Sequence, residues 1–294
     1  MFIAIDWGTT RLRAYLIGPD GDVLDRSSSD TGIQSVPPGG FPAALAKACG
    51  GWFSTQPDLP VIMAGMVGSR NGWAEASYVP PPCGSADLAA SLLPVHDTGR
   101  PVFIIPGVDC RASDGSYDVM RGEETQVFGA DMMDGLICLP GTHSKWVEVA
   151  GGRITRFATF VTGEVYAALS QSFVGRLAQE PDDLESGGAL ARTLGALEGG
   201  LTRTLFQART QVLAGHMAGH AVRPFLSSLL IDSEIRGARD LFGAGKKLQL
   251  VAGHPQRDPY AAALSYHGYA TEILEPEATT VAGLVRIAAL SGLV

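Results

Sequence analysis

Ile5-Asp6-Trp7-Gly8-Thr9-Thr10-Arg11-Leu12-Arg13 is the stretch of sequence that decides the fold. Apolar runs at 2–6, 12–17 and 23–27 surround it and predict three strands, the last two joined by a glycine-containing turn. The first strand ends in the carboxylate of Asp6, and a turn of small and hydroxyl residues follows. Such a turn can present backbone N–H groups to phosphate oxygens, while the carboxylate holds a hydrated Mg²⁺. An ordinary hairpin with a polar tip is the alternative.

The same pattern begins again at residue 136. Strands predicted at 136–139, 146–149 and 154–161 repeat the first three in order and length, and both copies place Gly-Thr in the first turn, Gly8-Thr9 and Gly141-Thr142. A helix at 41–53 and strands at 60–64 and 101–106 follow the first copy, with a loop-bearing insertion at 65–100. Largely helical sequence at 164–242 follows the second copy. Strands at 248–252 and 271–274 then alternate with helices at 260–267 and 280–290, which is typical of an α/β domain. We expect two domains, 1–134 and 135–294, with a cleft between them.

Composition narrows the class of protein. The 294 residues are 46% hydrophobic and 18% charged, with a net charge of −8, so a folded core is expected and neither nucleic acid nor an anionic membrane is an expected partner. The four cysteines are far apart and form no CxxC pair, which favours reduced, buried thiols over a zinc site. The sequence has no signal-peptide pattern and no apolar run of membrane-spanning length. A cytoplasmic protein is predicted.

Six motifs in order carry a resemblance to a known family. They are Asp6-Trp7-Gly8-Thr9-Thr10, Met63-Ala64-Gly65-Met66-Val67-Gly68-Ser69, Met120-Arg121-Gly122-Glu123-Glu124-Thr125-Gln126, Pro140-Gly141-Thr142-His143, Lys145-Trp146 and Thr162-Gly163-Glu164. Together they resemble the 2-dehydro-3-deoxygalactonokinase family of the sugar kinase, hexokinase, Hsp70 and actin superfamily. The resemblance implies two ribonuclease-H-like domains with an interdomain cleft, the first bearing a sugar-binding loop and the second a nucleotide-binding segment. It also implies ATP and Mg²⁺ as cofactors and a small sugar acid, 2-dehydro-3-deoxy-D-galactonate, as the substrate phosphorylated to its 6-phosphate in galactonate catabolism.

The resemblance assigns the nucleotide to two loops and one strand end. Asp6 is the metal ligand, and Lys145 acts as a point charge on the phosphates. The remaining phosphate or nucleotide contacts are Gly8, Thr9, Thr10, Arg13, Gly141, Thr142, His143, Ser144 and Gly253. Ala252 stands where the family has the first of two glycines. Taken alone, Lys145 can equally be a strand-edge lysine beside Trp146.

The catalytic base is expected at a helix start, where Glu123 and Glu124 follow Gly122. Comparison with the family does not decide between the two, and we favour Glu124 slightly. Glutamates in a first turn can instead merely complement the helix dipole, which stabilises by about 0.3 to 1 kcal/mol each.

A keto-deoxy acid brings a carboxylate, for which an arginine fork is expected. Arg70 and Arg121 are the candidates, and either can instead be a surface residue. The other predicted substrate contacts are Ser69, Trp73, Tyr78 and Glu164, of which the last can equally cap a helix. Glu234 lies on the apolar stripe of a helix and needs a partner, either a nucleotide ribose or an arginine such as Arg236 or Arg239.

Two rival functions stay open at the level of sequence. One is a kinase for another sugar acid or sugar, and the other is an actin-like or Hsp70-like nucleotide switch without a sugar site. A P-loop kinase is not expected, because Gly243-Ala244-Gly245-Lys246-Lys247 lacks the leading glycine and has Lys247 where a hydroxyl residue should follow. A homodimer is one assembly that the sequence allows.

Overall fold

The computed structural model describes residues 1–96, 98–112, 115–172, 175–177 and 200–293. It consists of two compact units. Unit 1 contains Met1–Asp134, Val149–Phe157 and Glu275–Val294, and unit 2 contains Gly135–Glu148 and Ala158–Leu274. The chain leaves unit 1 after residue 134 but returns to it twice. A division into 1–134 and 135–294 therefore omits two segments that contact the first unit.

Unit 1 is built on a six-stranded sheet in the order β3-β2-β1-β4-β7-β6. Its strands are β1 (Phe2–Trp7), β2 (Leu12–Ile17), β3 (Val23–Ser29), β4 (Val61–Ala64), β6 (Leu93–Pro94) and β7 (Val102–Ile104). Strand β1 is antiparallel to β2 and parallel to β4, and all of its apolar side chains are buried. Helix α1 (Phe41–Thr55) packs its apolar face, Phe41, Leu45 and Cys49, into the same core.

The second part of unit 1 holds elements that the sequence did not predict. The segment expected to be a loop-bearing insertion contains the short 3-10 helix η2 (Met66–Gly68), strand β5 (Tyr78–Val79) and helix α2 (Ser85–Ala90). Strands β8 (Gly107–Arg111) and β9 (Tyr117–Met120) form a small sheet in the order β5-β8-β9. Helix α3 (Glu123–Gly129) follows β9 directly.

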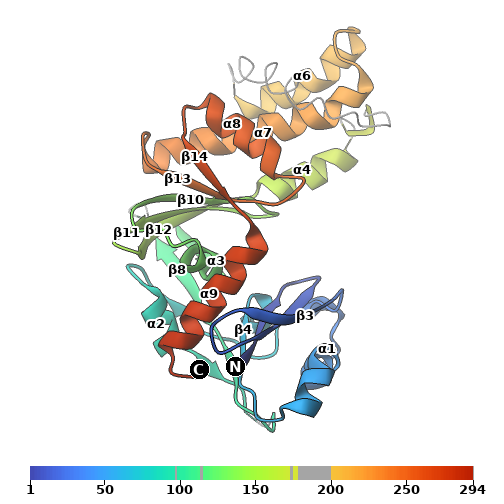
Figure 1. Ribbon diagram of the computed structural model, residues 1–294. Helices are drawn as coiled ribbons and strands as arrows, with labels where there is room; N and C mark the ends of the chain where they lie inside the picture. The colour runs from blue at the N-terminus through green and yellow to red at the C-terminus, as the bar shows by residue number, and fades with distance from the viewer. Residues whose placement is uncertain (97, 113–114, 173–174, 178–199, 294) are drawn as a thin grey trace. The chain divides into compact units, whose positions relative to one another are not determined.

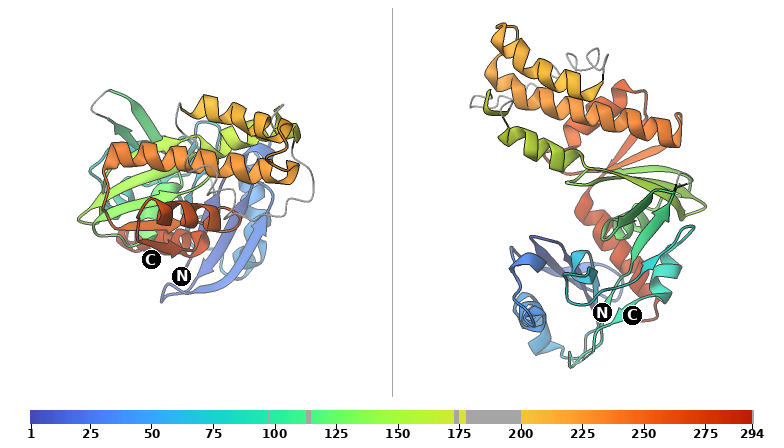
Figure 2. Two further views of the ribbon diagram at one scale, coloured as in Figure 1. Left: turned by 90° about the horizontal axis from the view of Figure 1, so that it is seen from above. Right: turned by 180° about the vertical axis from the view of Figure 1, so that it is seen from behind.

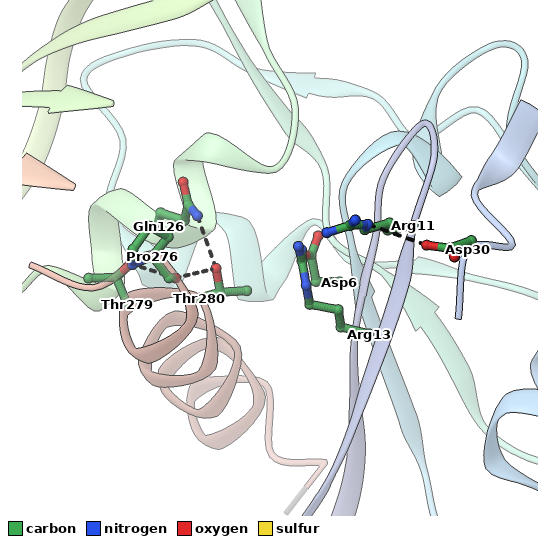
Figure 3. Close-up of polar contacts among 8 residues, drawn as sticks. All are labelled: Asp6, Arg11, Arg13, Asp30, Gln126, Pro276, Thr279 and Thr280. Atoms are coloured by element: carbon green, nitrogen blue, oxygen red, sulfur yellow. Dashed lines mark hydrogen bonds and ion pairs between the residues drawn. The ribbon is translucent and has the colours of Figure 1, made fainter. Parts of the chain in front are cut away.

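Helix α9 (Pro276–Leu290), near the end of the chain, packs along α3 and α2 (Figure 1). The backbones of α3 and α9 are in very close contact. A Cβ atom at Gly129 would lie 1.8 Å from the Thr279 carbonyl oxygen, and one at Gly283 would lie 1.9 Å from that of Thr125. Gln126 Nε2 also donates a hydrogen bond of 3.1 Å to Thr280 Oγ1 (Figure 3). Only glycine at these two positions allows the helices to cross so closely.

A five-stranded sheet in the order β12-β11-β10-β13-β14 repeats the order β3-β2-β1-β4-β7. Its strands are β10 (Gly135–Leu139), β11 (Ser144–Ala150), β12 (Arg153–Phe160), β13 (Leu248–Val251) and β14 (Thr271–Leu274). The predicted repeat is confirmed, and the fold consists of two ribonuclease-H-like halves.

The helices described in unit 2 are α4 (Thr162–Gln171), α6 (Leu201–Leu213), α7 (Val222–Phe242) and α8 (Arg257–Tyr266). Helix α6 packs beside α7 (Figure 2). Short 3-10 helices occur at η1 (Ile33–Ser35) in unit 1 and at η3 (Gly175–Leu177) and η4 (Gly219–Ala221) in unit 2. Part of the predicted helical stretch at 164–242, residues 178–199, lies outside the described residues.

The burial of the cysteines confirms one prediction from composition. All four, Cys49, Cys83, Cys110 and Cys138, are unbridged and buried. In the described ranges no helix has both the length and the apolar character needed to cross a membrane.

Candidate functional site

The first Gly-Thr turn is held from one side by the first two residues of the 3-10 segment η1. Ile33 N donates to the Gly8 carbonyl at 3.1 Å, and Gln34 N donates to the Thr9 carbonyl at 3.3 Å. Because C=O and N–H point in opposite directions in a trans peptide, the N–H groups of Thr9 and Thr10 point away from that segment. The turn is therefore arranged to offer these donors to an anion.

Asp6 lies at the end of β1, opposite Arg13 of β2 in the strand register. Arg13 Nη1 donates to Asp6 Oδ2 at 2.8 Å (Figure 3). One quarter of the Asp6 side chain is exposed. Burial raises the pKa of Asp6 above its ordinary value, the Arg13 guanidinium lowers it, and the negative charge of Glu123 raises it. Arg13, predicted as a phosphate contact, is thus placed as the partner of Asp6.

Two glycines bring the Asp6 strand end and the glutamate helix together. Gly65 has φ +96°, and a Cβ atom there would lie 2.9 Å from the Trp7 carbonyl oxygen and 3.5 Å from Asp6 Oδ1. Gly122 has φ +110°, and its Cβ would lie 3.2 Å from the Gly65 Cα. Both positions require glycine for conformation as well as for space. The close packing places Asp6 and the start of α3 in one cluster.

Glu123 and Glu124 occupy different environments. Glu124 is fully buried; its Oε2 accepts from Gly122 N at 2.7 Å and its Oε1 accepts from Thr125 Oγ1 at 3.2 Å. Burial, with a further contribution from the charge of Glu123, raises the pKa of Glu124 to about 8. Glu123 is only partly buried, and its Oε2 accepts from Arg121 N at 3.0 Å. Glu123 is therefore the more accessible carboxylate of the two.

Arg121 fastens the predicted sugar loop to the strand that precedes α3. Its Nη2 donates to the Ala76 carbonyl at 2.7 Å, and its guanidinium lies 4.4 Å from the centre of the Tyr78 ring. Arg121 is 9% exposed, and its Nε and Nη1 are buried without a hydrogen-bond partner among the described residues. In this conformation the side chain holds the loop, and its unpartnered nitrogens are covered by protein.

The other predicted sugar-loop residues differ in exposure. Arg70 is exposed and has no ion-pair partner within the described ranges. Ser69 is partly buried and donates its hydroxyl to the Met66 carbonyl at 2.7 Å. The Trp73 ring is 5.9 Å from Phe41 in a stacked arrangement and 6.4 Å from Trp7. Trp73 therefore packs against the core of unit 1 as well as belonging to the predicted sugar loop.

In unit 2 the second Gly-Thr turn leads into β11. Gly163 packs on this turn, since a Cβ atom there would lie 2.3 Å from the Gly141 carbonyl oxygen. His143 Nε2 lies 2.7 Å from Glu164 Oε2, and both side chains are exposed. Lys145 is buried and its Nζ donates to the His143 carbonyl at 3.3 Å. Glu164, predicted as a sugar contact, is thus the neighbour of the second turn.

Glu234 has partners that the sequence did not predict. Its carboxylate accepts from Trp146 Nε1 at 2.8 Å and from Tyr260 Oη at 2.7 Å. Burial raises the pKa of Glu234, and hydrogen bonds from Thr162, Tyr260 and Trp146 lower it. Arg236, one of the two arginines considered as possible partners, instead donates from Nε to Asp232 at 2.9 Å. A sequence signal was available, because a carboxylate on an apolar helix stripe requires buried donors.

A pocket of about 280 Å³ lies beside the second turn. Parts of α4, α7 and α8 form its wall, with Gly141, Thr162, Gly163, Tyr166, Arg223, Pro224, Ser227, Ser228, Leu230, Ile231, Pro255, Gln256, Pro259, Tyr260 and Ala262 lining it. Small-molecule pockets of proteins usually measure roughly 300–1,000 Å³. This pocket therefore suits part of a ligand, such as a base with its ribose.

Gly253, the predicted nucleotide contact after β13, does not line this pocket. After β13, the first residue that lines the pocket is Pro255, two positions beyond Gly253, and the lining continues into α8. The α7 residues that line the pocket were missed, because only the fold brings a helix near residue 225 to a turn near residue 141.

The acidic cluster of unit 1 fits a magnesium ion that also binds phosphate. In the part of the chain that the structure describes, no group of three His, Cys, Asp or Glu side chains could hold a metal. Magnesium, however, is commonly bound through one or two carboxylates together with phosphate oxygens and water. Asp6 Oδ1 faces Gly65, at a place that any larger side chain would fill. Asp6 is thus the residue suited to hold it.

Comparison with known proteins shows the family to which the chain is similar. The 2-keto-3-deoxy-galactonokinase family model matches residues 6–287. The chain is 35% identical to the 2-dehydro-3-deoxygalactonokinase of Escherichia coli (strain K12), over 98% of this chain and 97% of that protein. It is also 35% identical to a Rhizobium meliloti (strain 1021) protein assigned the same name, over 96% and 95%.

Solved structures agree with this placement. A Sinorhizobium meliloti protein, assigned as a 2-dehydro-3-deoxygalactonokinase, superposes with a TM-score of 0.89 at 33% identity, covering 98% of each chain. The ADPNP-bound activator of the Clostridium difficile 2-hydroxyisocaproyl-CoA dehydratase shares the fold alone, with a TM-score of 0.55 at 11% identity over 99% of this chain and 95% of that one. The resemblance seen in the six motifs is confirmed, and the chain belongs to the 2-keto-3-deoxy-galactonokinase family.

Proposed function

We propose that this protein transfers the γ-phosphoryl group of ATP to the terminal hydroxyl of 2-keto-3-deoxygalactonate and forms the 6-phosphate. One observation carries the proposal beyond family membership. Equivalent Gly-Thr turns follow the first strand of each sheet, one beside a carboxylate cluster and the other beside a pocket of nucleoside size. Phosphoryl transfer depends mostly on positioning and on neutralising charge, and these are what the two sets of residues offer.

The nucleotide is proposed to bind through unit 2. Its base and ribose occupy the 280 Å³ pocket, and its phosphates meet the turn Gly141–Lys145, where Lys145 supplies a positive charge. The N–H groups of Thr9 and Thr10 add donors for the transferred phosphoryl group. Asp6 would hold Mg²⁺, which when bound neutralises charge on the phosphate oxygens.

Glu123 is proposed as the residue that orients the substrate hydroxyl and accepts its proton. A base must come within hydrogen-bond reach of the hydroxyl, and Glu123 retains exposed surface whereas Glu124 has none. The negative charge of Glu123 also raises the pKa of Asp6, so the two carboxylates are close enough to interact electrostatically. Glu124 in this arrangement holds the first turn of α3 in place.

Arg70 is proposed to bind the substrate carboxylate. It is the exposed arginine of the loop 65–78, and its planar guanidinium can form two parallel hydrogen bonds with a carboxylate. Arg121 keeps that loop in shape through Ala76 and Tyr78. Sugar hydroxyls would then meet Ser69 and Tyr78 on the same loop.

A substrate panel tests the proposed function. Purified protein is given ATP, with and without Mg²⁺, and a set of keto-deoxy sugar acids, sugar acids and sugars, and ADP formation is measured. We expect Mg²⁺-dependent turnover that is fastest with 2-keto-3-deoxygalactonate. Faster turnover with another acid or sugar would reassign the substrate, and ATP turnover indifferent to every sugar would favour a nucleotide switch.

The cellular location and assembly are part of the same proposal. Four buried, unbridged cysteines fit a cytoplasmic protein. A homodimer remains a prediction, which light scattering of the purified protein would test.

A further inference from the structure

A chain of hydrogen bonds in unit 2 joins the pocket wall to the second turn. Tyr260, which lines the pocket, donates to Glu234 of α7 at 2.7 Å. The Tyr260 oxygen is also 3.1 Å from Ser144 Oγ, and Gly141 N donates to Ser144 Oγ at 3.4 Å. Ser144 also forms a hydrogen bond with the Glu234 carboxylate, so the Ser144 hydroxyl lies between the Tyr260 hydroxyl and that carboxylate.

The same carboxylate fixes a second point on β11. Trp146 Nε1 donates to Glu234 at 2.8 Å, and the Trp146 side chain is fully buried. Ser144 and Trp146 are two residues apart on the strand, so they point to one face and Lys145 between them points to the other. Holding both neighbours therefore fixes the direction in which the Lys145 side chain leaves the strand.

Burial makes this arrangement specific. Ser144, Trp146 and Glu234 are almost fully buried, and a buried carboxylate needs its hydrogen-bond donors. None of the three can turn away to water. The position of the turn Gly141–Lys145 is thus tied to two helices, α7 and α8, that also form the pocket.

We propose that Glu234 and Tyr260 are positioning residues that aim Lys145 and set the turn Gly141–Lys145 for the phosphates of the nucleotide in the pocket. The inference rests on the proposed function, in which this turn binds phosphates. Neither residue is required to touch a phosphate. Their effect passes through Ser144 and Trp146.

Tyr260→Phe is the principal test, because it removes one hydroxyl and keeps the ring. The Km for ATP should rise about tenfold and kcat should fall by a similar factor, whereas the Km for the sugar acid should stay within twofold. Glu234→Gln should act in the same direction, because Trp146 and Tyr260 donate to different oxygens of Glu234 and one of these becomes an NH2 group that cannot accept. The double variant should cost no more than the worse single variant if both act through one chain of contacts.

Tyr269→Phe is the matched control. The Tyr269 ring lies 6.3 Å from Trp146, and its hydroxyl is buried without a hydrogen-bond partner among the described residues. Its removal should leave both Km values and kcat within twofold. Trp emission should shift in Glu234→Gln, because the indole of Trp146 loses its charged acceptor, and should not shift in the control.

Direct binding of ATP·Mg²⁺, measured by calorimetry without sugar acid, separates this inference from the proposed function. Weaker ATP binding by Tyr260→Phe but not by Tyr269→Phe supports the inference even if the wild type phosphorylates no sugar acid. Equal ATP affinity and kcat in Tyr260→Phe and the wild type, whatever its melting temperature, would overturn it. A wild type that binds no ATP would overturn both.

Discussion

At the scale of single residues, two adjacent glutamates give opposite expectations. Glu123→Gln should lower kcat by roughly 10²- to 10⁴-fold with modest changes in Km, because it removes the proposed proton acceptor. Glu124→Gln should keep kcat within about tenfold, since a fully buried side chain does not reach a substrate. Steady-state kinetics of both variants decides between them. The reverse ranking would return the base to Glu124, the choice that sequence alone slightly favours.

The raised pKa of Glu124 predicts a pH dependence of stability. The folded pKa of about 8 lies above the ordinary value of 4.5, so the protonated form is the one that folding favours. Its contribution is complete below about pH 4.5 and is lost as the pH rises through about 8. The stability of the wild type relative to Glu124→Gln should therefore fall between pH 5 and pH 8.5. Urea unfolding at both pH values checks this, and a constant difference would show that Glu124 does not titrate in this range.

The two arginines near the sugar loop should separate binding from folding. Arg70→Ala should raise the Km for the sugar acid at least tenfold, with the melting temperature and the Km for ATP nearly unchanged, because an exposed charge is lost. Arg121→Ala should lower the melting temperature, since Ala76 and Tyr78 lose a buried partner. If instead Arg121→Ala alone raised the Km for the sugar acid at an unchanged melting temperature, Arg121 would be the carboxylate ligand.

At the scale of elements, the crossing of α3 and α9 fixes the position of Glu123 and Glu124 at the start of α3. Gly283→Ala places a methyl group against the Thr125 carbonyl, so the helices must separate, at a cost of about 1–3 kcal/mol. Both the free energy of unfolding and kcat should fall. Gly50→Ala is the control, because nothing lies within 4 Å of a Cβ at this position in α1 and alanine favours helices. An unchanged stability in Gly283→Ala would show that the crossing is looser than described.

Apolar runs predicted the central strands of both sheets because nearly all of their side chains are buried, as in β1 and β10. The predicted strands at 12–17 and 271–274 have the observed bounds of β2 and β14. Strands β8 and β9 were missed because charged residues interrupt them, Asp109 and Arg111 in β8 and Asp118 in β9, so they lack a clear apolar pattern. For the site, motifs identified the two turns and the glutamates. The partners of Glu234 depend on residues 88 and 26 positions away in the sequence, which only folding brings together.

At the scale of the whole molecule, the two groups of residues should respond to different ligands. ADP should slow hydrogen exchange near 141–145, 162–166 and 255–260, the segments of the turn and the pocket. The sugar acid alone should slow hydrogen exchange near 65–78 and 121–124. Hydrogen exchange followed by mass spectrometry reads both sets separately. Protection of the 255–260 segment by the sugar acid alone would show that the pocket belongs to the substrate.

The position of α9 in the sequence also bears on how the protein is made. Unit 1 takes its helix α9 from residues 276–290, and all of unit 2 is synthesised before them. At about 5–20 residues per second, the interval between the completion of α3 and the appearance of α9 is on the order of ten seconds or more. During that time the face of α3 with Gly129 has no partner. The helix start that carries the glutamates therefore acquires its support only after residues 276–290 have been synthesised, so a chain that stops before them should lack kinase activity.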